Sequence, residues 1–154
     1  MNIDKYRELS EDEQRARFFL MEETIDRGMI SVAEGKKLLL ENKFSSEIYE
    51  SLKEKEVFVE IDGNIGYIYP VSGFPTHHRV KRADGKEFYA MCAVDALGTY
   101  KTFYQNIEIE SICSETGEKI QVVIEEGEIV KYSPENIHVL HVDLDKFKNW
   151  AANC

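Results

Sequence analysis

The hydrophobic pattern of this chain changes from helical to strand-like near residue 57. Before that point, capping signals and apolar residues at helical spacing dominate. After it, short β-branched runs alternate with turn residues. A run of helices followed by a run of strands is typical of an α+β fold, because the two kinds of element are segregated along the chain.

Three helices are predicted in the first part of the chain. Residues 10–28 and 31–42 each begin with the Ser-x-x-Glu pattern of a capping box and end at a glycine or an asparagine. Ser45 or Ser46 is expected to cap the third helix. Phe18 is among the apolar side chains expected on the inner faces of these helices.

A β-hairpin is predicted directly after the helices. Residues 57–61 and 65–69 have strand composition, Asp-Gly-Asn at 62–64 forms the turn, and Pro70 closes the second strand. Helices followed by a hairpin are arranged as in a winged-helix fold. We therefore predict a winged-helix-like N-terminal domain over residues 1–72.

The remaining residues, 73–154, are predicted to form a second, mostly antiparallel domain. A turn at 83–86 leads into residues 87–97, which we expect to run into a helix rich in small residues. Asp143 or Asp145 is expected to cap a last helical segment. The strands of an antiparallel meander are expected at 107–112, 120–124, 129–132 and 137–142.

The charge of the chain argues against nucleic acid as a partner. Lys and Arg total 19 and Asp and Glu total 29, which gives a net charge of −10 at pH 7. Such a surface repels phosphates, and a winged helix that binds DNA needs a basic face. No apolar run approaches the ~20 residues of a membrane span, and the first residues do not resemble a secretory signal. We expect a cytoplasmic protein without a nucleic-acid or membrane partner.

The three cysteines, Cys92, Cys113 and Cys154, are widely spaced. An odd number without a Cys-x-x-Cys pair indicates neither a disulfide framework nor a four-thiolate zinc site. Cys92 and Asp95 form the sharpest local feature, because residues three apart on a helix share a face and can share a proton. The alternative is a small buried Cys92 that only packs, beside an exposed Asp95.

Cys113 and two adjacent histidines carry weaker signals. Cys113 ends a predicted strand before a Ser-Glu-Thr-Gly turn, where a packed core thiol is the first interpretation and a metal ligand the second. His77 and His78 are neighbours in an extended segment, so their side chains point to opposite faces and do not readily bind one ion. We expect surface or turn roles for both histidines.

The segment Phe-Tyr-Ala-Met-Cys-Ala-Val-Asp-Ala-Leu at 88–97 resembles the organomercurial (alkylmercury) lyases. Their signature is an aromatic residue, Ala, a large residue and then Cys-Ala-x-Asp-x-Leu on a helix. Cys-Ser-Glu-Thr-Gly at 113–117 is similar to the Cys-x-x-Thr-Gly turn of that family. The helices and hairpin of the first part are similar to the winged-helix-like front of the family, so the likeness spans most of the chain.

The resemblance implies an enzyme that cleaves carbon–mercury bonds by protonolysis and releases a hydrocarbon and Hg(II). Carried over by motif, Cys92 is the first catalytic cysteine, Asp95 the catalytic aspartate and Cys113 a structural thiol. Cys154 takes the place of the second catalytic cysteine, so Cys92, Cys154 and Asp95 would hold mercury as substrate and product. No organic cofactor is implied. The implied partners are an organomercurial, or a related organometallic molecule, and a thiol or dithiol that accepts the metal.

Several alternatives stay open at this point. Members of the family continue beyond the second catalytic cysteine, whereas this sequence stops at Cys154. We expect either a short member that has lost a sheet edge and the active-site lid, or a reading frame interrupted at a selenocysteine codon. A non-catalytic mercury- or copper-binding protein on a related fold would keep the thiols without needing Asp95. A winged-helix regulator that senses metal through its thiols is a third interpretation, and the negative charge of both halves counts against it.

Overall fold

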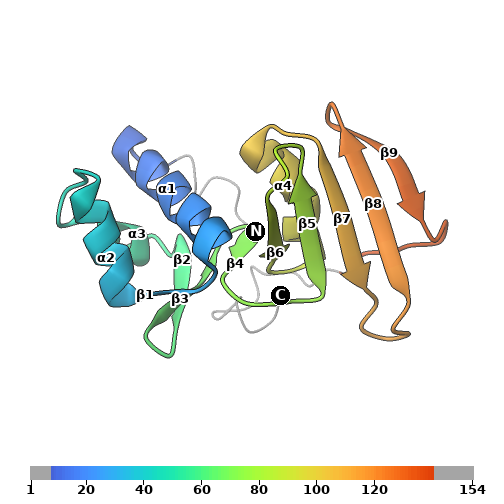
Figure 1. The fold of residues 1–154 in the computed structure, drawn as a ribbon, viewed down its shortest axis with the longest axis horizontal. Coiled ribbons are helices and arrows are strands. Elements are labelled where there is room, and N and C mark those ends of the chain that lie inside the picture. Colours follow the sequence, from blue (N-terminus) through green and yellow to red (C-terminus); the bar gives the residue numbers. More distant parts are fainter. Residues whose placement is uncertain (1–7, 141–154) are drawn as a thin grey trace.

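The computed structural model describes residues 8–140, and its first part consists of three helices. In Figure 1 they lie together at one end of a long sheet. Ser10 and Glu13 form both halves of the predicted capping box, and Gly28 ends the first helix at a φ of 79°. The three helices are α1 (Glu11–Arg27), α2 (Val32–Glu41) and α3 (Ile48–Glu54).

The ends of α2 agree with the sequence, but the start of α3 does not. Ser31 accepts a hydrogen bond from the Glu34 backbone N–H at the start of α2, and Asn42 is its C-cap. The predicted serine cap of α3 is wrong, because Glu47 is the N-cap and makes no side-chain hydrogen bond. A turn precedes this helix, and the backbone carbonyl of Ser45, rather than its hydroxyl, accepts a hydrogen bond from Ile48 N–H.

In the part of the chain that the structure describes, the strands form one nine-stranded sheet in which every pair is antiparallel. The α+β fold class is therefore confirmed. The order across the sheet is β1-β3-β4-β6-β5-β7-β8-β9, and β2 pairs with β3. The strands are β1 (Ile30–Ser31), β2 (Phe58–Ile61), β3 (Asn64–Ile68), β4 (Val71–Ser72), β5 (His78–Arg82), β6 (Glu87–Ala90), β7 (Ile107–Ile112), β8 (Lys119–Glu125) and β9 (Glu128–Ser133).

The sheet continues through the predicted domain boundary at residue 72. The short strand β4 pairs with β3 of the hairpin on one side and with β6 on the other. Buried side chains of both parts, from Leu20 to Val80 and Ile124, belong to one hydrophobic core. The division into domains 1–72 and 73–154, and the winged-helix character of the first, stay predictions.

A buried ion pair also joins the two parts. The Arg82 side chain of β5 is 3% exposed and binds Glu22 of α1 and Asp84 of the following turn. Lys86 binds the same Glu22 carboxylate at 3.1 Å. The position of α1 is therefore fixed relative to β5 by charged groups as well as by apolar packing.

Residues 87–97 are a strand followed by a helix rather than a run into one helix. Residues 87–90 form β6, and helix α4 (Ala93–Phe103) begins later than expected. Figure 1 shows α4 behind the sheet, where it packs against β5, β6 and β7. Two strands flank β6, so backbone pairing on both edges outweighs the helical propensity of this segment.

The predicted meander is present in its first three strands, β7, β8 and β9. Its fourth run, 137–142, is not a strand over residues 137–140, the part that the structure describes. Pro134 follows β9 directly and has no N–H to donate to a ladder. The predicted caps at Asp143 and Asp145 lie outside the described residues.

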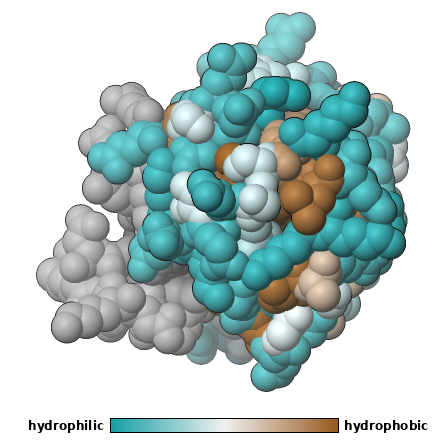
Figure 2. Space-filling view, turned by 90° about the vertical axis from the view of Figure 1, so that its left-hand side faces the viewer, coloured by the Kyte–Doolittle hydropathy of each residue, from teal (hydrophilic) through white to brown (hydrophobic). Residues whose placement is uncertain are grey.

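The surface of the helical end is mainly hydrophilic. Figure 2 views the molecule from this end and shows polar side chains interrupted by a few hydrophobic patches. Leu40 of α2 and Met29 after α1 are among the exposed large apolar residues. Over residues 8–140, no helix combines the length and the apolar character needed to cross a membrane.

Candidate active site

The junction between β6 and α4 positions Cys92 and Asp95. Strand β6 is held on both sides, by Val71 of β4 opposite Ala90 and by Arg79 of β5 opposite Tyr89. The chain leaves the sheet at Met91, and Cys92 has an extended backbone (φ −142°, ψ 177°). A rigid strand therefore carries the cysteine to the first turn of the helix.

Cys92 is the N-cap of α4, the residue from which the helix starts. Its Sγ accepts a hydrogen bond from the Asp95 backbone N–H at 3.5 Å, as a serine oxygen does in a capping box. Cys92 Sγ is also 3.2 Å from Asp95 Oδ2, to which it donates. The expected pairing of the two side chains is present, and it arises from helix capping rather than from a shared helical face.

Asp95 is buried, so the alternative of an exposed helix residue is wrong. Its exposed fraction is 3%. Burial, followed by the charge and the hydrogen bond of Cys92, raises the pKa of Asp95 from its usual 3.8 to about 8. The carboxyl group is therefore largely protonated at neutral pH. A protonated acid beside a thiol can give its proton to a group bound at the sulfur.

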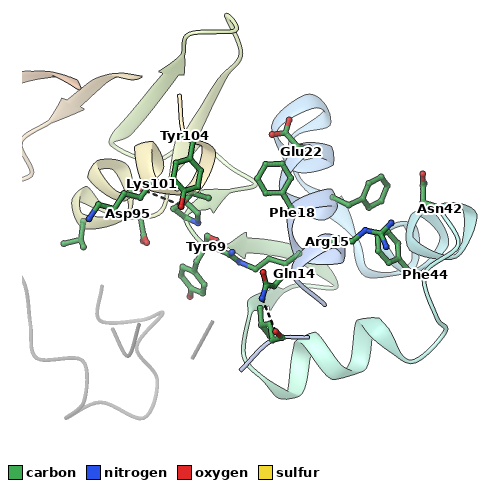
Figure 3. Close-up of a pocket in the computed structure, with 17 residues that line it drawn as sticks. Gln14, Arg15, Phe18, Glu22, Asn42, Phe44, Tyr69, Asp95, Lys101 and Tyr104 are labelled. Atoms are coloured by element: carbon green, nitrogen blue, oxygen red, sulfur yellow. Dashed lines mark hydrogen bonds between the residues drawn. The ribbon is translucent and has the colours of Figure 1, made fainter. Parts of the chain in front are cut away.

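A cavity of about 1170 Å³ lies between α1 and α4 and reaches Asp95. Figure 3 shows Phe18 and Gln14 on the α1 side and Lys101, Tyr104 and Asp95 on the α4 side. Spacing in the sequence gives no sign that α1 and α4 face one another, and none of the lining residues other than Asp95 was predicted to belong to a site. The pattern of α1 placed Phe18 on an inner face, but it is 42% exposed.

Cys113 follows β7 and lies in a turn, outside the buried core. It is partly exposed, its N–H donates to the Glu118 carbonyl, and its own carbonyl accepts from Gly117 N–H. Hydrogen bonds from the Thr116 side chain and backbone lower the pKa of the Cys113 thiol. The interpretation as a packed core thiol is therefore wrong, whereas the structural role implied by the family resemblance stays a prediction.

Within residues 8–140, the two histidines do not form a metal site with other ligands. His77 is exposed. His78 begins β5, and its Nδ1 is 2.9 Å from Ser111 Oγ. Burial of this ring lowers the pKa of His78. Residues 8–140 contain no group of three or more His, Cys, Asp or Glu residues that could hold a metal ion.

Cys154, the predicted second ligand, lies outside the described residues. Of the predicted site residues, the structure therefore brings together Cys92 and Asp95. Cys92 caps the helix through its sulfur although cysteine is not among the usual N-cap residues, so the sequence carried no capping signal at this position.

Comparisons with known proteins point to one family. The sequence model of the alkylmercury lyase family matches residues 71–154. The alkylmercury lyase of Staphylococcus epidermidis is 32% identical over 78 residues, which are 51% of this chain and 36% of that protein. The alkylmercury lyase of Bacillus cereus is 40% identical over 60 residues, which are 39% of this chain and 27% of that protein.

A solved structure is similar over a longer part of the chain. The crystal structure of the mercury-bound form of MerB2 covers 85% of this chain at 20% identity, with a TM-score of 0.64, and the match spans 64% of that protein. At this identity the likeness concerns the fold. The family match covers more than half of the sequence and includes the strand, cap and helix that carry Cys92 and Asp95. This chain belongs to the alkylmercury lyase family.

Proposed function

We propose that this protein cleaves the carbon–mercury bond of organomercurials by protonolysis at Cys92 and Asp95. The observation that carries the proposal is the 3.2 Å contact between the Cys92 sulfur and a buried Asp95 carboxyl at the edge of a large cavity. Mercury is a soft cation that prefers thiolate ligands, and Asp95 is the acid next to that ligand. The matched part is about a third of the length of the curated relatives, so their name alone does not carry the proposal.

The substrate is taken as an organomercury cation bound to the thiolate of a small molecule. In the first step, the Cys92 sulfur replaces that thiolate on mercury. The hydrogen bond between Cys92 Sγ and Asp95 Oδ2 holds one proton between the two groups. When the Hg–S bond forms, that proton passes from the sulfur to Asp95, whose raised pKa keeps it there at neutral pH. The displaced thiolate leaves, and the organic group remains bonded to mercury beside a neutral carboxylic acid.

In the second step, Asp95 gives its proton to the carbon bonded to mercury. The electron pair of the C–Hg bond forms the new C–H bond, the hydrocarbon leaves and Asp95 becomes a carboxylate. Hg(II) stays on the Cys92 thiolate, and Cys154 supplies the second thiolate ligand. A thiol or dithiol from solution then removes the metal. No organic cofactor takes part in this scheme.

The test is release of hydrocarbon from phenylmercury, measured as benzene by gas chromatography. We expect Cys92→Ser and Asp95→Asn each to abolish the release. Cys113→Ser is the matched control, because it removes a thiol in a turn outside the cavity lining, and we expect it to retain release. Full activity of Asp95→Asn would overturn the proposal. Mercury binding without hydrocarbon release, unaffected by Asp95→Asn, would instead indicate a non-catalytic soft-metal binding protein.

A further inference from the structure

The cavity beside Asp95 is far larger than a methyl group needs. Sites for drug-sized organic ligands typically measure about 300–1,000 Å³, and this cavity measures about 1170 Å³. In the proposed reaction the carbon atom lies between mercury and Asp95. The rest of the organic group therefore extends into the space that Asp95 borders.

Phe18 of α1 presents a fixed aromatic ring to this space. The ring packs edge-to-face on Phe103, with centroids 5.7 Å apart and planes at 63°, and it remains 42% exposed. Phe103 is itself held by Phe88, at 5.5 Å between centroids, and by the Arg82 guanidinium at 4.6 Å. Phe18 is therefore held in place on one side and open to the cavity on the other.

Tyr104 presents a second ring from the end of α4. It is the C-cap of the helix at a φ of 51°, a left-handed conformation in which glycine is usual. A bulky residue at this φ is strained by ~1 kcal/mol or more, yet the side chain is 83% exposed and lines the cavity. Burial in the core does not account for an aromatic residue here. Figure 3 shows the Phe18 and Tyr104 rings on the two walls of the cavity.

We propose that Phe18 and Tyr104 form an aromatic pair that binds the organic group of arylmercury compounds and favours them over small alkylmercury compounds. The inference rests on the proposed function, because it places the carbon–mercury bond between Cys92 and Asp95. An aryl group beyond Asp95 offers a flat π surface for edge-to-face or offset contact with the two rings. A methyl group offers no such surface and leaves the cavity filled with water.

The test measures how phenylmercury and methylmercury each divide between Cys92 and a competing monothiol in solution. The full chain carries Cys113→Ser and Cys154→Ser, so that intact mass reports mercury on Cys92 alone. We expect Cys92 to retain phenylmercury several-fold better than methylmercury, relative to the monothiol. Phe18→Leu keeps apolar volume and Tyr104→Asn keeps the left-handed backbone, and each is expected to lower this preference by about 2- to 10-fold.

Tyr132→Leu is the matched control, since it removes an exposed aromatic side chain of β9 outside the cavity, and the preference should be unchanged. The aromatic pair is overturned if the chain with Cys113→Ser and Cys154→Ser retains both mercurials equally. It is also overturned if neither Phe18→Leu nor Tyr104→Asn changes the preference for phenylmercury. Because Tyr104 is 83% exposed, Tyr104→Asn gives a result even where Phe18→Leu fails to fold.

Hydrocarbon release in the chain with all three cysteines separates this inference from the proposed function. Release of benzene and methane with no aryl preference in the binding test supports the function and overturns the aromatic pair. An aryl preference that both substitutions lower, without release of hydrocarbon, supports the aromatic pair as a binding site and overturns the proposed function.

Discussion

Replacing Asp95 by Asn is expected to stabilise the protein at neutral pH while it abolishes the proposed reaction. In the native state the pKa of Asp95 is about 8, against 3.8 for an ordinary aspartate. Between these values the native carboxyl holds a proton that the unfolded chain has released. The stability of the wild type therefore falls as pH rises from 3.8 to about 8, and the full penalty applies above that range.

The size of the effect follows from the shift. Each unit of pKa difference corresponds to about 1.4 kcal/mol of unfolding free energy. At pH 7 the stability penalty that the wild type carries is therefore at most about 4 kcal/mol. Asn is neutral at every pH and avoids this penalty, but it weakens the hydrogen bond with Cys92, worth ~1 kcal/mol. We expect Asp95→Asn to raise the free energy of unfolding at pH 7 by about 3 kcal/mol.

The assay is urea unfolding of both proteins at about pH 5.5, 7 and 8.5. The advantage of the variant should grow by about 2 kcal/mol between the first two values and level off above pH 8. Asp84→Asn is the matched control. Arg82 lowers the pKa of Asp84, so the ionised Asp84 carboxylate stabilises the native state. Removing this carboxylate should therefore destabilise the protein at pH 7. A variant Asp95→Asn that is less stable than wild type at pH 7, or an advantage independent of pH, would refute the reasoning.

Three further predictions follow from the structure. The rate of hydrocarbon release should fall as pH rises through about 8, because the active form of Asp95 is protonated; a rate that increases steadily to pH 10 in a stopped-time benzene assay would contradict this role. Arg82→Gln should lower the free energy of unfolding by about 3 kcal/mol, read from urea midpoints, since it leaves Glu22 without its buried guanidinium partner. Gly73→Ala should lower the thermal midpoint by several degrees, because a Cβ there meets the backbone oxygens of Ile65 at 3.0 Å and of Gly66 at 3.2 Å; an unchanged midpoint would contradict this close approach.

Local signals in the sequence predicted the fold where the structure depends on local interactions. The capping box at Ser10 and the glycine after α1 set the ends of that helix correctly, because both act within one helical turn. The segment after Lys86 was predicted wrongly for the opposite reason. Its aromatic and alanine residues suit either a helix or a strand, and pairing with β4 and β5, which are distant in sequence, decides for a strand.

The site was predictable only in part for the same reason. The contact between Cys92 and Asp95 spans three residues, so both the motif and the spacing could indicate it. The burial of Asp95 and the cavity require α1 to face α4, and these helices begin about eighty positions apart. Phe18 shows the difficulty: helical periodicity places it on an apolar face but does not tell whether that face meets the core or a cavity.

Helix α1 forms one wall of the cavity that Asp95 borders, so it shapes the candidate site as well as stabilising the fold. Arg82 binds Glu22 of α1 and stacks on Phe103 of α4, and Phe103 in turn holds Phe18. This chain of contacts keeps α1 against the helix that carries Asp95. Under the proposed function, Glu22 and Arg82 would therefore act without touching the reacting atoms, through the position of α1 as one wall of the cavity that Asp95 borders.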